Sequence, residues 1–544
     1  MPAVDHRARR VTPADDHPLL QQVSRAALWN ALLLPLLSVL NLAFAVVIRR
    51  RFGLFSGVYD VLLGLLSALL LYSGVGIPSA LSKFLPEVAA LSGAQAVGRF
   101  LRQAAIIRLG CLALLLVPLN LLAEPVSSKL GLGPDGPIYI ALMSGLTVAR
   151  AVLQFMIQAL NAFFAQLWSN LFALAQAALD IALVGLALFV GFEMAGVLGG
   201  LLASATLVAA ASVSYTRRLL SRSGEGAADA RGREPATGGA WFEGETDRVI
   251  RFSAFSYLFG FLGFFTDMGF AAPVLALTLA PAQVALFATA FKLTFMTVVL
   301  VVSGFRGLYQ PVFARLRIRN DPRQLQQAFA AVSKAQLVLL VPAGMGLMVM
   351  SGDYIPLLFG AEFLPAVPIS WVLVGLMYAE TAFNLPNIIL SVDERYRALF
   401  WTQAIALVAA PLFVVAAGTL GLVGAACILG GTRLSTALAG YAFARRAYGV
   451  RFPWAFAAKV GSVGLVMAAA IGVARLFWPT SLTEALVLTA AGVVVYVVGL
   501  RLARVLGPEE IDLIRRSQVP GHAWVVAWLA PSAEGGRTSA GLPT

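Results

Sequence analysis

The chain has 544 residues, of which 59% are hydrophobic and 12% are charged, and its formal net charge is +13. Soluble proteins usually have about a quarter of their residues charged, so this composition excludes the ordinary soluble classes. About 20 apolar residues cross a bilayer as one helix, and the hydrophobic residues suffice for about fourteen such spans. The composition therefore predicts an all-α, polytopic membrane protein.

Few residue types that support catalysis are available. Cys111 and Cys427 lie in apolar runs, which indicates no disulfide framework. The histidines, His6, His17 and His522, lie near the termini, which excludes a histidine metal site within the apolar runs. The sequence contains no Walker A motif, no carboxylate-rich metal motif and no serine nucleophile elbow. We therefore predict a carrier and not an enzyme, with no cofactor and no metal.

The apolar runs give the expected spans. Fourteen of them are free of charge clusters: residues 26–48, 55–80, 103–123, 137–158, 167–190, 194–215, 253–275, 281–304, 335–351, 366–390, 398–418, 420–443, 455–476 and 483–503. With the N-terminus inside, 31 Lys and Arg residues fall on the cytoplasmic side and five on the other. The excess of cytoplasmic Lys and Arg predicts a protein of the cell (inner) membrane with both termini in the cytoplasm, and it explains the net charge without nucleic acid.

The chain divides at a hydrophilic stretch rich in Gly, Ala, Glu and Arg, which is typical of disorder. The expected parts are a cytoplasmic N-terminal segment (1–25), a six-helix bundle (26–215), a cytoplasmic linker (216–251), a second six-helix bundle (252–443), two further helices (444–504) and a cytoplasmic tail (505–544). Ser56–Ala105 and Pro281–Ala335 share an order of apolar span, basic amphipathic segment and Gln/Arg-bearing helix start. Repeated halves of this kind are typical of transporters and predict pseudo-symmetric bundles.

One polar stripe lies on the fourth span. Thr147, Arg150, Gln154, Gln158 and Asn161 recur every three or four residues, which places them on one helix face. A charge at the centre of a span costs at least ~2.5–3.5 kcal/mol, so this face must contact protein or water. Two interpretations stay open: interhelical bonding, with Arg150 held by a carboxylate such as that of Asp180, or the lining of a hydrated cavity.

Other polar residues interrupt the second half. Glu380, Asn384 and Asn387 form a second stripe, beside Pro386. Asp267 and Lys292 lie at similar depths on consecutive spans, so we predict that they approach each other in at least one state. Snorkelling is the preferred interpretation for three arginines near the cytoplasmic ends, namely Arg108, Arg306 and Arg433.

Three arginines, Arg49, Arg50 and Arg51, lie at the predicted outer end of the first span, against the usual charge distribution. They are interpreted either as interfacial anchors or as contacts for an anionic headgroup or diphosphate.

Several segments resemble the polysaccharide-transporter (oligosaccharide flippase) family of the multidrug/oligosaccharidyl-lipid/polysaccharide (MOP) exporter superfamily. The resemblance covers about residues 30–460 and is carried by RRRFGLFSGVYDVLLGLLSALLLYSGVGIPSALSKFLPEVAA, PLLFGAEFLPAVPISWVL, NIILSVDERYRA and GTLGLVGAACILGGTRL. It implies a MATE-like fold, in which two six-helix bundles enclose a cavity and alternate access. It also implies transport of undecaprenyl-diphosphate-linked sugar from the cytoplasmic to the outer leaflet, in the company of other polysaccharide-assembly proteins.

The charged and polar residues within or beside the spans are the candidates for the functional residues of such a carrier. The candidates for lining the cavity or binding the substrate are Arg150, Gln154, Gln158, Asn161, Lys292, Arg49, Arg50, Arg51, Asn384 and Asn387. The candidates for a coupling proton or Na⁺ are Asp180, Asp267 and Glu380. Two alternatives remain: a cation-coupled multidrug exporter, which predicts an acidic or aromatic cavity, and a membrane enzyme of glycan assembly, which needs a large outer loop.

Overall fold

A computed structural model describes residues 17–163, 165–230, 240–319, 321–477 and 481–507, and within these ranges the chain is helical and contains no strand. Most of the predicted N-terminal segment and of the predicted tail, residues 1–16 and 508–544, lies outside the described residues. An all-helical chain is what a bilayer requires, because helices satisfy their backbone groups internally.

The first half contains α1 (His17–Phe52), η2 (Gly53–Phe55), α2 (Ser56–Tyr72), α3 (Ile77–Leu121), α4 (Ala123–Lys129), α5 (Gly136–Ala162), α6 (Gln166–Val190) and α7 (Met194–Ala230). The second half contains α8 (Ala240–Phe264), α9 (Met268–Ala276), α10 (Pro281–Arg319), α11 (Pro322–Phe359), η3 (Ala361–Ala366), α12 (Val367–Phe383), α13 (Leu385–Val392), α14 (Tyr396–Thr419) and α15 (Gly421–Tyr448). Two further helices, α16 (Trp454–Phe477) and α17 (Leu482–Leu502), follow.

The number of membrane spans agrees with the sequence once two bends are considered. Twelve segments of the described chain are long and apolar enough to cross a membrane, or 13 if α8 and α9, which meet at 53°, form one broken span. Leu33–Tyr72 counts as a single segment, although it contains both α1 and α2. Counting these two helices separately gives the fourteen spans that the sequence predicts.

The chain reverses direction between α1 and α2. Arg49 and Asp60 form an ion pair of 2.6 Å, and the rings of Phe44 and Tyr59 lie 6.2 Å apart. Eleven residues of straight helix would separate Arg49 from Asp60 by about 16 Å, so the helix cannot continue. The turn lies at Gly53, whose φ of +55° is favoured by glycine.

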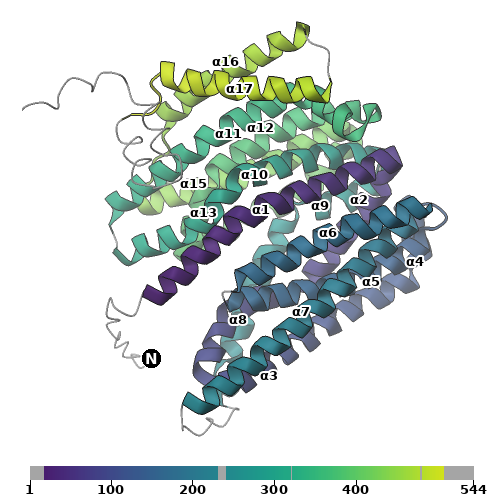
Figure 1. The fold of residues 1–544 in the computed structure, drawn as a ribbon, viewed down its shortest axis with the longest axis vertical. Coiled ribbons are helices and arrows are strands. Elements are labelled where there is room, and N and C mark those ends of the chain that lie inside the picture. Colours follow the sequence, from purple (N-terminus) through teal and green to yellow (C-terminus); the bar gives the residue numbers. More distant parts are fainter. Residues whose placement is uncertain (1–16, 164, 231–239, 320, 478–480, 508–544) are drawn as a thin grey trace, which may run out of the picture.

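The helices gather into two bundles (Figure 1). Helices α3, α5, α6 and α7 form one, α10–α15 form the other, and α16 and α17 lie beyond α11 on the outside of the second bundle. Helix α1 runs between them and contacts both α6 and α10, while α2 contacts both α5 and α10. The approach is close, since a Cβ built on Gly57 would lie 1.7 Å from the carbonyl oxygen of Pro281. The first two helices therefore join the bundles.

The predicted linker is largely helical where the structure describes it. Helix α7 continues to Ala230 and α8 begins at Ala240, so of residues 216–251 only 231–239 lie outside the described chain. The composition indicated disorder because it is polar and contains glycine, but Glu, Arg and Ala residues also favour helix when an apolar span continues into them.

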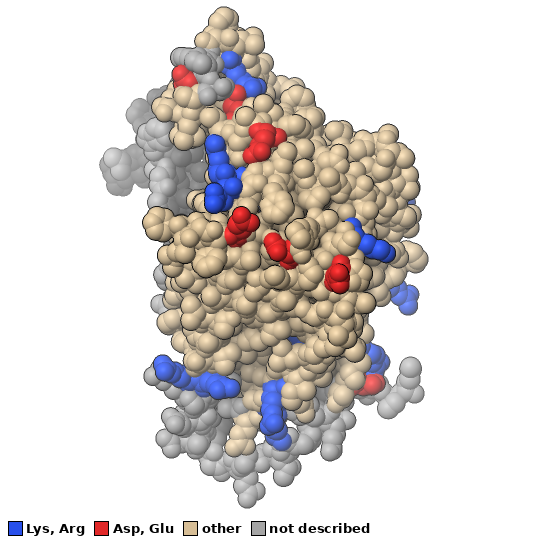
Figure 2. Space-filling model, turned by 90° about the vertical axis from the view of Figure 1, so that its right-hand side faces the viewer, with Lys and Arg blue, Asp and Glu red and all other residues tan. Residues whose placement is uncertain are grey.

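The surface is dominated by uncharged residues. On the face shown in Figure 2, acidic and basic side chains are scattered between large areas of other residues. Many of the exposed side chains are large and apolar, such as Phe189, Leu121 and Phe477. Surfaces of this kind, which would aggregate in water, are expected where lipid covers the protein, and the protein is a multi-pass membrane protein.

Candidate substrate-binding region

The polar stripe on α5 is divided between two neighbouring helices. Gln154 accepts a hydrogen bond from Arg108 of α3, and Gln158 accepts one from Ser82 of the same helix, at 3.2 and 3.3 Å. Asn161, at the end of the stripe, accepts one from Ser169 of α6 at 2.7 Å. In this state the stripe therefore holds α3, α5 and α6 together through interhelical hydrogen bonds.

Arg150 forms the ion pair that the sequence suggested. Its Nη2 lies 2.7 Å from Oδ2 of Asp180 on α6. Oδ1 of Asp180 accepts hydrogen bonds from Gln176 at 2.6 Å and from Ser204 of α7. The Arg150 side chain is 28% exposed, so it also reaches a surface of the bundle. The interhelical ion pair is confirmed, and the lining of a hydrated cavity by Arg150 stays a prediction.

The second stripe binds an arginine that was expected to snorkel. Nη2 of Arg433 lies 3.2 Å from Glu380, and its Nη1 donates to the carbonyl of Thr266 at 3.1 Å. Snorkelling is therefore wrong for Arg433, whose side chain is only 18% exposed. Asn387 donates to Asn384 at 3.0 Å, across the break between α12 and α13. The side chain of Arg306 lies outside the described residues.

The arginines that end α1 have three different environments. Arg49 is buried, with Nη2 on Asp60 at 2.6 Å and Nε donating to Thr289 of α10 at 2.8 Å. Arg50 is exposed and donates from Nε to the carbonyl of Leu358 at 3.0 Å, near the end of α11. Arg51 is exposed. Interfacial anchoring is therefore wrong for Arg49, because the turn at Gly53 directs it into the protein.

Lys292 of α10 lies near the pair of Arg49 and Asp60, and its side chain is half-buried. The charges of Lys292 and Asp60 act on each other, and the charge of Arg49 acts on Lys292. Arg49 pairs with Asp60 directly and Lys292 acts on them through space, so two positive charges and one negative charge lie where α1, α2 and α10 meet. Sequence reasoning did not single out Asp60, although a lone aspartate within the apolar run SGVYDVLLGLL was a signal of a buried partner.

Asp267 does not pair with Lys292 in this state. It lies at the break between α8 and α9, where its carboxylate accepts a hydrogen bond from the backbone N–H of Gly269 at 2.8 Å and caps α9. The side chain is exposed. Asp180 and Glu380 both have arginine partners, so Asp267 is the coupling candidate that has no ion-pair partner among the described residues.

Aromatic side chains cover the region beside this break. Phe264 and Phe261 of α8 lie 5.9 and 6.0 Å from Tyr72 of α2, and Phe265 lies 5.2 Å from Phe270 of α9. All of these rings are partly exposed. The arrangement forms an aromatic wall between the two bundles, which the sequence analysis missed because the rings come from three helices.

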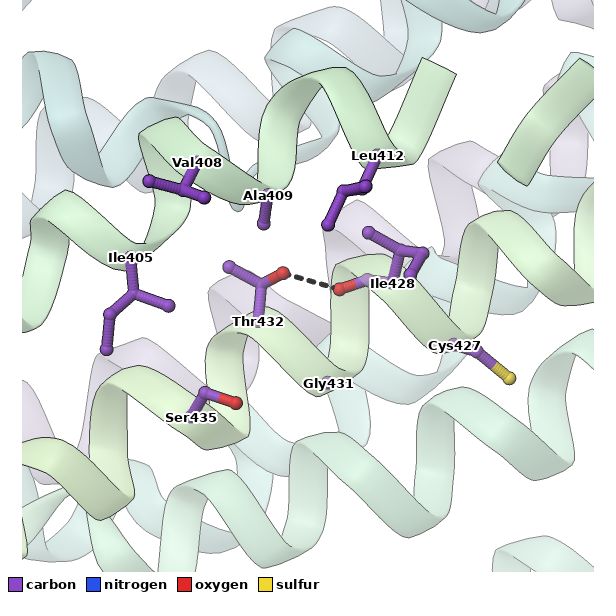
Figure 3. Close-up of a pocket in the computed structure, with 9 residues that line it drawn as sticks. All are labelled: Ile405, Val408, Ala409, Leu412, Cys427, Ile428, Gly431, Thr432 and Ser435. Carbon is purple, nitrogen blue, oxygen red and sulfur yellow. Dashed lines mark hydrogen bonds between the residues drawn. The ribbon is translucent and has the colours of Figure 1, made fainter. Parts of the chain in front are cut away.

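Two hollows lie elsewhere, each of about 420 Å³. The first lies between α14 and α15 (Figure 3). The hydroxyl group of Thr432, which lines it, donates a hydrogen bond to the carbonyl of Ile428 at 2.6 Å. None of the described residues that line it is charged, so it suits an apolar chain and not a phosphate. The second, near the start of α11, contains Asp393, whose hydrogen bond from Arg395 raises the pKa of Arg395 above its ordinary value.

Within the described residues, no group of three or more His, Cys, Asp and Glu side chains is placed to hold a metal ion. The free cysteines Cys111 and Cys427 lie on different bundles and are not bonded to each other.

Comparisons with known proteins agree with this arrangement. Residues 240–368 match a family model described as "Polysaccharide biosynthesis protein". The structure is similar to that of the lipid II flippase MurJ in an inward closed conformation, with a TM-score of 0.65 and 14% identity, over 88% of this chain and 98% of that chain. No curated protein sequence matches significantly.

The fold is also that of multidrug transporters. An inward-facing multidrug resistance MATE family transporter of the MOP superfamily matches with a TM-score of 0.57 and 14% identity, over 78% of this chain and 98% of that chain. The Vibrio cholerae MATE transporter VcmN in the bent form matches with a TM-score of 0.52 and 15% identity, over 80% and 98%. At such identities the likeness shows a shared fold.

Proposed function

We propose a substrate for this chain, whose family model and fold support its place among the polysaccharide transporters and flippases of the MOP superfamily. The proposed substrate is an oligosaccharide carried on undecaprenyl diphosphate. The two bundles move it from the cytoplasmic to the outer leaflet by alternating access, and its glycan then enters cell-surface polysaccharide assembly.

The observation that carries this proposal is the cluster formed by the buried Arg49–Asp60 pair and the half-buried Lys292, which has two positive charges and one negative. It lies where α1 and α2 meet α10. When the bundles separate, Arg49 loses its bond to Thr289 and the cluster presents a net positive charge to the space between them. A lipid diphosphate, which is very unfavourable in bare hydrocarbon, would exchange its hydration there for charge-assisted hydrogen bonds.

The other cavity candidates have graded roles in this proposal. Arg150 and Gln154 are accessible on α5 and extend the polar surface along the first bundle. Gln158, Asn161, Asn384 and Asn387 hold helices together in this state and would reach substrate only if the helices move. Arg50 and Arg51 are exposed beside the cluster and would contact a headgroup as it leaves.

Coupling is assigned to Asp267, because an exposed carboxylate at a broken span can exchange a proton or Na⁺ without first breaking an ion pair. Transport driven by an imposed pH or Na⁺ gradient should fall to the undriven rate in Asp267→Asn. Asp135→Asn, at an exposed cap of α5, is the matched control. Equal responses of the two variants to the gradient would remove Asp267 from the coupling step.

The proposed orientation has both termini in the cytoplasm. In a background without Cys111 and Cys427, Ala361→Cys should react with a membrane-impermeant thiol reagent only from outside, and a cysteine within residues 231–239 only from inside. The charge argument fails if either position reacts from the opposite side.

A second candidate, a multidrug exporter, is favoured by the aromatic wall of Tyr72, Phe261, Phe264 and Phe265. Aromatic faces attract lipophilic cations. Under this function, transport of a cationic dye should depend on these rings and not on Lys292.

The deciding experiment is transport by the purified protein in liposomes with defined polyprenyl-diphosphate sugars, followed by the appearance of sugar in the opposite leaflet. Lys292→Gln and Arg49→Gln should lose at least about 90% of the rate, since each removes a charge-assisted contact worth a tenfold factor or more. Their controls are Lys459→Gln and Arg446→Gln, which alter exposed cations that have no assigned role in binding. Dye export without lipid transport favours the exporter, and an altered covalent structure of the glycan favours an enzyme of glycan assembly.

A further inference from the structure

Arg108 is a buried cation in the middle of the first bundle. It lies at the centre of the candidate span Gln95–Leu121, and only 2% of its surface is exposed. Snorkelling, the interpretation from sequence, is therefore wrong, because the side chain points into the bundle. The residue one turn earlier, Ala104, belongs to one apolar cluster and the residue one turn later, Leu112, belongs to another. Arg108 interrupts the core between them.

The guanidinium group has almost no partners. Nη2 donates to Oε1 of Gln154 at 3.2 Å, whereas Nε and Nη1 are buried and have no hydrogen-bond partner. Four other arginines of the described spans each have a carboxylate: they are Arg49, Arg150, Arg433 and Arg475. Arg108 has none among the described residues. A buried charge without a counter-ion destabilises the folded protein, so we expect Arg108 to bind a negatively charged partner in another state.

The route to Arg108 leads through polar groups. Its one partner, Gln154, is exposed, which for an amide within a membrane span indicates water or another polar surface and not lipid. Arg150 lies one turn away on the same face of α5 and is also accessible. Gln154 bonds the Arg108 guanidinium from this accessible side, and exposed side chains change rotamer within nanoseconds, so this bond can open.

We propose that Arg108 is an anion subsite of the first bundle, covered by Gln154 in this state, that binds a phosphate group of the substrate. Guanidinium groups bind phosphate oxygens through several parallel N–H donors, and Arg108 keeps donors unused for this purpose. The inference rests on the proposed function, since the lipid diphosphate is the anion that enters between the bundles. It adds a binding group on α3, away from the cluster of Arg49, Lys292 and Asp60.

The first test measures binding with the purified full chain in lipid nanodiscs. Undecaprenyl diphosphate should bind Arg108→Gln at least about tenfold more weakly than it binds the unaltered protein. Arg102→Gln, at an exposed position on the same helix, should bind it equally well. Competition by inorganic pyrophosphate would show that a free diphosphate suffices, and its failure would show that the headgroup must arrive from the membrane.

The unfolding temperature of Arg108→Gln distinguishes a ligand-binding role of Arg108 from a purely structural one. Because Arg108→Gln removes a charge that has no counter-ion, the ligand-free variant should unfold at the same or a higher temperature. A lower unfolding temperature together with unchanged lipid binding would overturn the proposal. If the unaltered protein binds no polyprenyl diphosphate, the proposed substrate itself is wrong; if it binds and Arg108→Gln binds equally, only the assignment of Arg108 is wrong.

A second variant keeps Arg108 in place. In a background without Cys111 and Cys427, Gln154→Cys should react with a small anionic thiol reagent, and undecaprenyl diphosphate should slow the reaction at least about tenfold. This variant tests the site even if Arg108→Gln does not fold. A reaction rate that is the same with and without the lipid would contradict a ligand at Arg108.

Discussion

Removing the carboxylate of Asp60, which pairs with the buried Arg49, should strongly lower the free energy of unfolding. Asp60 is 7% exposed and Arg49 is 2% exposed, and their ion pair is 2.6 Å long. In Asp60→Asn, the buried Arg49 and the half-buried Lys292 would both lack the charge of Asp60 and would repel each other. Deleting one partner of a buried pair costs about 3–5 kcal/mol, and the repulsion places the expected loss in the free energy of unfolding at the upper end, about 5 kcal/mol.

The assay is reversible unfolding of the purified protein in mixed micelles. A double variant tests the cause, because Asp60→Asn combined with Lys292→Gln removes the repulsion and should recover about half of the loss. Asp135→Asn, at an exposed carboxylate, should change the free energy by less than about 0.5 kcal/mol. A double variant whose loss equals the sum of the single losses would refute the idea that these charges act as one cluster.

Three further predictions concern single contacts. Gly57→Ala places a Cβ 1.7 Å from the carbonyl oxygen of Pro281, so α2 and α10 must separate and the distance between spin labels at positions 51 and 361 should increase. Gly98→Ala, whose Cβ would meet open space, should leave that distance unchanged. Asp353→Asn removes the buried partner of Arg475 and should lower the free energy of unfolding by about 3 kcal/mol. The control Glu193→Gln, at an exposed position, should not change it. Equal unfolding curves of the two variants would mean that the pair does not hold α16 on α11. Arg433→Gln leaves Glu380 without its cation and should lower the unfolding temperature. Arg433→Lys should not restore that temperature, because one ammonium group cannot bind both Glu380 and the carbonyl of Thr266. Full recovery by lysine would refute the double role of Arg433.

The sequence alone determined the class of protein and the positions of its spans. Long apolar runs and low charge are properties of each segment by itself, and a bilayer allows such segments only one solution, the helix. The pair of Arg150 with Asp180 was also predictable and is confirmed, because both charges lie in spans close together in the sequence and have to be neutralised.

Only the tertiary structure decided which charges meet across the bundles. Arg49 reaches Thr289, which lies 240 residues away, and Lys292 lies near Asp60 and forms no ion pair with Asp267. Residue counts estimate the depth of a side chain along its span, but the rotation and tilt of each helix decide which side chains face each other. These angles are set by packing, such as the contact of Gly57 with Pro281 and the turn at Gly53. The burial of Arg108 has the same cause: a span's sequence gives the depth of a charge, and the neighbouring helices decide whether it reaches water, lipid or a ligand.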